Sequence, residues 1–92
     1  MRNVLLDNLS NRKDDFLFIT ADLGYRVIEV LKDSSPKKFL NTGVNEQFMA
    51  SFAAGVAKTK PCFIYSIANF STLRCLEQIR NDIVLHKVPV CI

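Results

Sequence analysis

The chain has 92 residues, of which 49% are hydrophobic and 23% are charged, and this composition is typical of a globular domain rather than a disordered or low-complexity segment. A chain of this length is too short to be a two-domain enzyme with its own substrate domain. Its formal net charge of +3 comes from basic residues that are mostly scattered singly, so no stripe of positive charge predicts nucleic-acid binding.

The first half of the sequence predicts two helices and two strands. A helix is expected before the first strand, because apolar residues recur there at helical spacing. Residues 16–20 form a short apolar run rich in aromatic and β-branched residues, which is typical of a buried strand. A shorter helix is expected after Gly24. Residues 38–42 predict a second, weaker strand, because turn-forming residues bracket them on both sides.

The second half repeats this alternation with a clearer pattern. Apolar residues between 48 and 57 recur at helical spacing and predict an amphipathic helix. Residues 62–67 form the third apolar run and predict a strand. Another helical pattern follows Ser71, which is the residue type expected to cap it. Residues 88–92 predict a fourth strand, with Pro89 near its start, where a missing N–H group is tolerated.

The order of these elements determines the predicted fold class. Strands separated by helices imply right-handed crossovers and a parallel sheet covered by helices on both faces, which is a three-layer α/β fold. Such a sheet is expected to continue beyond a fourth strand, yet the chain stops inside an apolar run. We therefore expect residues 1–92 to be one domain that is truncated after about the fourth strand.

The sequence also bears on compartment and metal content. Cys62, Cys75 and Cys91 are odd in number and lack CxxC spacing, so they predict neither a disulfide framework nor a zinc site. No other metal site is predicted. The apolar run at residues 4–6 is too short for a signal peptide, and no stretch approaches the roughly 20 apolar residues of a membrane span. We expect a cytoplasmic protein with reduced thiols and no membrane partner.

Candidate functional residues follow the predicted strands, because ligands of open α/β sheets bind beyond the carboxyl ends of strands. Glu46 lies in the first turn of a strongly apolar helix, just past a strand end. Alternatively, Glu46 has only a structural role, because acidic residues in the first turn of a helix commonly stabilise it through the helix dipole. Phe70 follows the third strand and is the second candidate. Alternatively, it is a core aromatic residue at a strand-to-helix turn, with no contact to a ligand.

Four other polar residues have simpler interpretations. Asp22 follows the first strand and is the type of residue that forms a turn or caps a helix. Arg74 and Arg80 are interpreted as solvated charges on a helix. His86 lies near a helix C-terminus, where an imidazole needs no special role.

Several motifs occur together, in an order that is more specific than any one of them. They are Asp22-Leu23-Gly24, Thr42-Gly43-Val44-Asn45-Glu46-Gln47, Ala53-Ala54-Gly55-Val56-Ala57, Lys60-Pro61, Tyr65-Ser66-Ile67-Ala68-Asn69-Phe70 and Leu76-Glu77-Gln78-Ile79-Arg80-Asn81-Asp82. From residue 16 to residue 92 the sequence resembles the pyrimidine-binding domain of thiamine-diphosphate-dependent transketolases. It is most similar to the short transketolase proteins that correspond to the C-terminal half, and more distantly similar to deoxyxylulose-phosphate synthases.

The resemblance implies roles for three residues. Glu46 matches the catalytic glutamate that hydrogen-bonds N1′ of the cofactor's aminopyrimidine and so promotes removal of the proton from the thiazolium C2. Phe70 matches the aromatic residue that stacks on the aminopyrimidine. Asp22 matches an aspartate near the cofactor at the subunit interface. These three residues are the expected site.

The resemblance also implies a shared active site. Thiamine diphosphate would lie between this chain and a diphosphate-binding domain or subunit in a homo- or hetero-oligomer, and that partner would carry the magnesium. The implied activity is transfer of two-carbon ketol units between sugars, with a sugar phosphate or related ketose as substrate, and the isolated chain is expected to be inactive. The alternative is a non-catalytic α/β module that dimerises through the helix containing Gly55.

Overall fold

The four strands form a single parallel sheet in the computed structural model, which describes residues 2–92. They are β1 (Leu17–Thr20), β2 (Phe39–Asn41), β3 (Cys62–Tyr65) and β4 (Val90–Cys91). Their order across the sheet is β2-β1-β3-β4, and each neighbouring pair is parallel. The predicted parallel α/β sheet is therefore confirmed.

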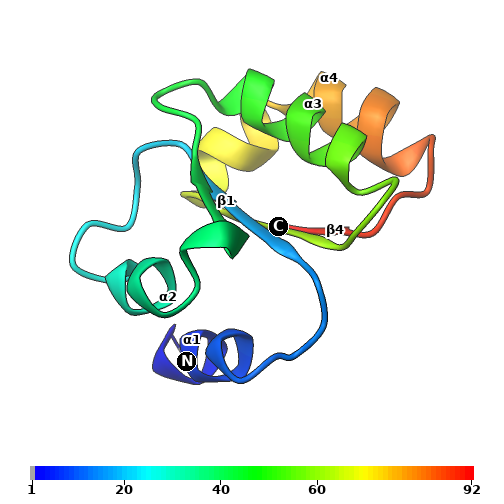
Figure 1. Ribbon diagram of the computed structural model, residues 1–92. Coiled ribbons are helices and arrows are strands. Elements are labelled where there is room, and N and C mark those ends of the chain that lie inside the picture. The colour runs from blue at the N-terminus through cyan, green and yellow to red at the C-terminus, as the bar shows by residue number, and fades with distance from the viewer. Residues whose placement is uncertain (1) are drawn as a thin grey trace.

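Helices cover both faces of this sheet (Figure 1). They are α1 (Arg2–Ser10), α2 (Glu29–Ser34), the 3-10 turn η1 (Pro36–Lys38), α3 (Glu46–Val56), the π-helix η2 (Asn69–Leu73), α4 (Leu76–Gln78) and the π-helix η3 (Ile79–Val84). One face carries α1 and α2, and the opposite face carries α3 packed against η2, α4 and η3. Within residues 2–92, no helix combines the length and the apolar character needed to cross a bilayer.

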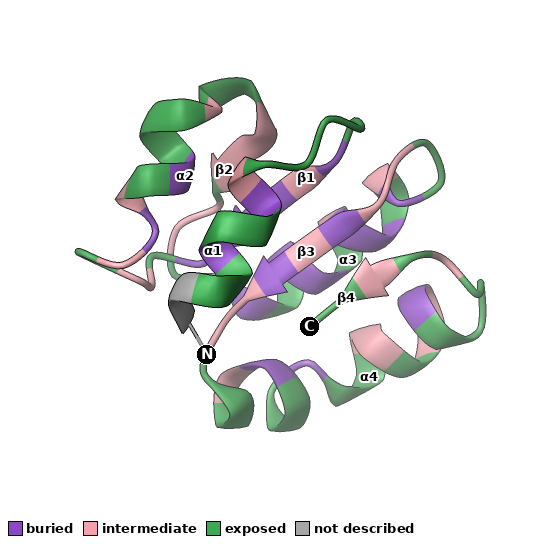
Figure 2. Cartoon of the chain, turned by 90° about the horizontal axis from the view of Figure 1, so that it is seen from below, coloured by how far each residue is buried: buried purple, intermediate pink, exposed green. Residues whose placement is uncertain are grey.

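The strand β1 contributes side chains to the hydrophobic layers on both faces of the sheet, because successive side chains of a strand point to opposite faces. Phe18 packs on the α1 and α2 side, in a cluster formed by Leu6, Leu9, Phe16, Phe18, Ile28 and Leu31. Ile19 packs on the α3 side, in a cluster formed by Ile19, Ala21, Met49, Ala53, Ala57, Cys62 and Ile64. Figure 2 shows these buried positions along β1, β3 and α3. The carboxyl ends of β1 and β3 are thus held rigidly between two packed layers.

The last helical segment differs from the sequence-based prediction. It begins at Asn69 and not after Ser71. The hydroxyl group of Ser71 donates to the carbonyl oxygens of Ile67 and Ala68, both at 3.3 Å, so it bonds back within the helix. The prediction that Ser71 caps the helix is therefore wrong. Further along the chain, the carbonyl group of Pro89 accepts a hydrogen bond from the N–H group of Cys62 at 3.1 Å, as expected for a proline that precedes a strand.

Gly24 supports a first stability prediction. Its φ is +89°, and a Cβ atom at this position would lie 2.9 Å from Cδ1 of Ile28. We expect Gly24→Ala to lower the free energy of unfolding by about 1 to 3 kcal/mol, because an alanine there is strained and also clashes. Thermal unfolding followed by circular dichroism measures this change.

Gly55 provides the matched control for that prediction. A Cβ atom at Gly55 would meet no atom within 4 Å. We expect Gly55→Ala to leave stability unchanged or to raise it by up to about 1 kcal/mol, because alanine favours the helix. A Gly24→Ala variant that unfolds at or above the wild-type temperature would contradict the described turn.

Candidate functional site

Glu46 is the first residue of α3, and local sequence explains its position. Gly43, with a φ of +78°, turns the chain after β2, and Asn45 then caps the helix by accepting a hydrogen bond from the N–H group of Phe48 at 3.3 Å. Glu46 is only 8% exposed. A glutamate that served only the helix dipole would have no need to leave water. Its burial favours a role within the site over the purely structural alternative.

Phe70 lies on the π-helix η2, just beyond the carboxyl end of β3, and its side chain is half-buried. Its N–H group donates to the carbonyl oxygen of Ile67 at 2.9 Å, and its carbonyl oxygen accepts a hydrogen bond from the thiol of Cys75 at 3.3 Å. Single π-helical turns are frequent at functional sites, because their wider spacing re-aims one side chain. The main chain around Phe70 is therefore fixed, while part of its ring stays accessible.

Arg74 connects the two predicted site residues. Its guanidinium carbon lies 4.1 Å from the centre of the Phe70 ring, which is a cation–π contact. Its Nη1 lies 3.8 Å from Oε1 of Glu46. The side chain of Gln47 also contacts the main chain of Arg74: Nε2 of Gln47 donates a hydrogen bond to the Arg74 carbonyl oxygen at 3.0 Å. The structure thus brings Glu46 and Phe70 together around one guanidinium group.

This arrangement corrects the interpretation of Arg74 as a solvated helix charge. The side chain is 57% exposed, but its head group contacts both candidate residues. Sequence reasoning missed this role because a lone arginine on the polar side of a helix carries no distinguishing pattern. The signal that was available is the spacing of four residues between Phe70 and Arg74, which places the two side chains on one helical face.

An open hollow of 330 Å³ lies beside Glu46. It is lined by Val44, Asn45, Glu46, Gln47 and Arg74. A buried carboxyl group near an aromatic ring can hold a flat nitrogen heterocycle, because the protonated carboxyl group donates a hydrogen bond to a ring nitrogen while the aromatic ring stacks on the flat face. This donor set fits the aminopyrimidine of thiamine diphosphate.

Cys75 borders the same site but is not suited to act as a nucleophile. Burial raises the pKa of the Cys75 thiol, and the nearby Glu46 carboxylate raises this pKa further, against a smaller opposing effect of Arg74. The residue therefore remains a neutral thiol near neutral pH, and such thiols are unreactive. Its contribution is the hydrogen bond to the Phe70 carbonyl oxygen.

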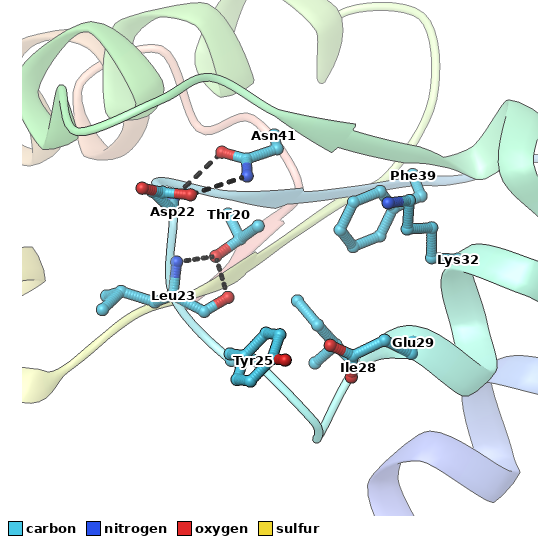
Figure 3. Close-up of a pocket in the computed structure, with 10 residues that line it drawn as sticks. Thr20, Asp22, Leu23, Tyr25, Ile28, Glu29, Lys32, Phe39 and Asn41 are labelled. Carbon is cyan, nitrogen blue, oxygen red and sulfur yellow. Dashed lines mark hydrogen bonds between the residues drawn. The ribbon is translucent and has the colours of Figure 1, made fainter.

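Asp22 lies in different surroundings, at the carboxyl end of β1 (Figure 3). Its φ of +55° and its pairing with Asn41 identify it as a turn residue: the N–H group of Asp22 donates to Oδ1 of Asn41 at 2.9 Å, and Nδ2 of Asn41 donates to Oδ1 of Asp22 at 3.3 Å. The residue lines a cavity of 340 Å³ that also includes Tyr25, Glu29 and Lys32. Its neighbours are thus β2 and α2, whereas Glu46 and Phe70 converge on Arg74.

The remaining polar candidates have local roles. Arg80 is exposed beyond α4. The Nδ1–H group of His86 donates to the carbonyl oxygen of Asn81 at 2.9 Å. This hydrogen bond connects His86 to η3, the helical segment that it follows. Among residues 2–92, no group of three or more His, Cys, Asp or Glu side chains is placed to hold a metal ion.

Comparison with known proteins agrees with this geometry. The family described as "Transketolase, pyrimidine binding domain" matches residues 2–92. The chain is 37% identical over 68 residues to a 1-deoxy-D-xylulose-5-phosphate synthase of Chlamydia felis, covering 74% of this chain and 10% of that protein. It is 30% identical over 88 residues to the 1-deoxy-D-xylulose-5-phosphate synthase of Mycolicibacterium vanbaalenii, and this match covers 95% of this chain and 14% of that protein.

A third relative is a protein of Methanocaldococcus jannaschii that is named as a transketolase C-terminal section. The two are 35% identical over 87 residues, which covers 92% of this chain and 28% of that protein. The chain therefore spans between a tenth and just over a quarter of the length of these relatives. Because the family match extends over nearly every residue, the chain belongs to the transketolase pyrimidine-binding-domain family.

Proposed function

We propose that this chain supplies the pyrimidine-binding half of a shared thiamine-diphosphate site, in a transketolase-like enzyme that transfers two-carbon ketol units between sugars. The observation that carries the proposal is that a buried carboxylate, Glu46, and a half-buried aromatic ring, Phe70, both contact one planar group, the guanidinium of Arg74. Both residues lie at the carboxyl edge of a parallel sheet, where α/β proteins bind their ligands. Family membership supports the same cofactor.

Glu46 and Phe70 have complementary roles in this proposal. Glu46 would share a proton with N1′ of the aminopyrimidine, and its place at the start of α3, capped by Asn45, fixes the backbone that carries the carboxyl group. Phe70 fixes the plane of the pyrimidine by stacking. Thiamine diphosphate, when bound, supplies the carbon nucleophile that attacks the ketose carbonyl. Asp22 is proposed to lie near the cofactor where the two subunits meet.

The proposal requires a second domain or subunit. In this proposal the chemistry of the site is divided between two parts, so a diphosphate-binding partner is expected to hold the diphosphate and magnesium in a homo- or hetero-oligomer. Residues 2–92 match the pyrimidine-binding-domain family, and no group of three or more His, Cys, Asp or Glu side chains among them is placed to hold that metal. We expect no turnover from the 92-residue chain alone. The expected substrate is a sugar phosphate or related ketose.

Calorimetric titration tests this function. Thiamine diphosphate and magnesium are titrated into the chain combined with a diphosphate-binding subunit. We expect binding heat with the wild type and little or none with Glu46→Ala, because that variant loses the carboxylate that faces Arg74 and lines the hollow. An unchanged isotherm in Glu46→Ala, or no heat with the wild type, would count against the proposal.

The non-catalytic alternative rests on a different observation. Gly55 lies on α3, and the space where its Cβ would stand is empty. A glycine at a helix surface has no side chain there, so another backbone can approach it closely. In that case no titration heat is expected, and sedimentation is expected to show a dimer that Gly55→Leu dissociates.

A further inference from the structure

The side chain of Arg74 lies between Phe70 and Glu46, where the proposed site would bind a heterocycle. Its guanidinium carbon lies 4.1 Å from the centre of the Phe70 ring, which is within stacking range. On its other side, Nη1 faces the Glu46 carboxylate at 3.8 Å. Both residues that are proposed to hold the cofactor ring therefore contact the same side chain of their own chain.

The chemistry of this group matches the chemistry of the proposed ligand. A guanidinium group is planar, so it can lie flat on an aromatic face, and it carries N–H donors at its edge that pair with a carboxylate. An aminopyrimidine has a similar flat face, and its edge carries an amino donor and a ring nitrogen that can share a proton with a carboxyl group. Only one such group can occupy the stacking position on one face of Phe70, because both need the same few ångströms of space above the ring.

Resting on the function proposed above, we propose that Arg74 is an internal occupant of the pyrimidine site that the cofactor must displace. The side chain can leave because it is 57% exposed and borders the open hollow beside Glu46. Its main chain can stay in place, because Nε2 of Gln47 holds the Arg74 carbonyl oxygen at 3.0 Å. Displacement thus requires a change of side-chain rotamer and no rearrangement of the helix.

Arg74 is expected to weaken cofactor binding without preventing it. When the binding-competent conformation is only a fraction of the population, the apparent Kd rises by the inverse of that fraction. Partly exposed cation–π contacts and ion pairs of this kind are individually weak, so the arginine competes but is readily displaced. Its removal should therefore tighten binding, which is the opposite of what a cofactor-binding residue would show.

The test is calorimetric titration of thiamine diphosphate, with magnesium, into the chain combined with a diphosphate-binding subunit. We expect Arg74→Ala to lower the Kd by about tenfold, because the competing conformation is removed. Arg80→Ala is the matched control, since it removes the same charge from an exposed position on the next helical turn. It is expected to stay within about twofold of the wild type, because exposed charges contribute little. Unchanged or weaker binding in Arg74→Ala would overturn the inference.

The Glu46→Ala titration separates this inference from the function on which it rests. If Glu46→Ala binds as well as the wild type, or the wild type does not bind, the proposed function fails and the displacement inference fails with it. If Glu46→Ala loses binding while Arg74→Ala binds no more tightly than the wild type, only the inference about Arg74 fails.

The wild-type complex provides a second measurement. The ring current of Phe70 should shift the side-chain resonances of Arg74 upfield in an isotope-labelled sample, because the guanidinium lies over the ring. Adding thiamine diphosphate is expected to remove this shift. An upfield shift that persists at saturation would show that Arg74 stays on Phe70 and would overturn the inference.

Discussion

Glu46→Gln is expected to reduce turnover of the complete enzyme by at least about 100-fold while leaving the fold intact, because general acid–base catalysis typically contributes this much or more. The amide has nearly the same size and shape as the carboxyl group, so the packing at the start of α3 is retained. It cannot, however, accept and return a proton at a ring nitrogen. The loss of charge opposite Arg74 is expected to have little effect on stability, because the 3.8 Å pair is long and its arginine is 57% exposed.

The measurement is kcat of the assembled enzyme together with the unfolding temperature of each variant. Glu77→Gln is the matched control, because Glu77 lies exposed on α4 and the same change of atoms there should alter neither quantity. Turnover close to that of the wild type in Glu46→Gln would contradict the proposed proton-transfer role. A large drop in unfolding temperature would indicate instead that the carboxylate is mainly structural.

Phe70→Ala is expected to weaken cofactor binding far more than it lowers stability. Removing the ring takes away a stacking partner worth about 0.5 to 1.5 kcal/mol in addition to the apolar area that it covers, so we expect the Kd to rise by about tenfold or more. The ring is only half-buried. Its removal should therefore cost less than the roughly 3 to 5 kcal/mol that is typical of a fully buried phenylalanine.

Phe52→Ala is the matched control for this prediction. Phe52 packs against the hydrophobic cluster on the α3 side of the sheet, so its truncation should lower the unfolding temperature with little effect on Kd. Titration and thermal unfolding of the two variants should thus give opposite patterns. Losses of binding and stability in Phe70→Ala that match those of Phe52→Ala would indicate that Phe70 is a core residue.

Periodicity alone predicted most of the fold. The run at residues 16–20 alternates side chains between two packed layers, with Phe18 on one and Ile19 on the other, and this explains why it is apolar throughout. The helix at 48–57 was predicted from its apolar spacing, and Met49 and Ala53 do face the sheet. Such patterns are reliable because burial on one face imposes them directly.

The start of the last helix could not be predicted in this way. Ser71 is a residue type that favours helix caps, but its hydroxyl group finds acceptors within the helix, at the carbonyl oxygens of Ile67 and Ala68. The π-helical spacing of η2 and η3 has no simple apolar period. Local propensity was therefore overridden by how this segment packs against α3.

The candidate site was only partly predictable from its residues. Glu46 and Phe70 are 24 residues apart, and their convergence depends on parallel strands ending at the same edge of the sheet. Their pairing was indicated by the resemblance to a family and not by spacing. Arg74 was missed because its role depends on a rotamer that lies over Phe70, which no sequence pattern specifies. Asp22 lies in a turn, which was one of the structural alternatives that its sequence context left open, and its expected role near the cofactor stays a prediction.

The central claim is that Glu46 and Phe70 hold one heterocycle between them. A crystal structure of the chain assembled with a diphosphate-binding subunit, magnesium and thiamine diphosphate tests it most directly. We predict the Glu46 carboxylate within about 2.6 to 3.2 Å of N1′, the Phe70 ring stacked on the pyrimidine, and Arg74 turned away from that ring. A pyrimidine bound elsewhere, with Arg74 still lying over Phe70 and facing Glu46, would contradict the account.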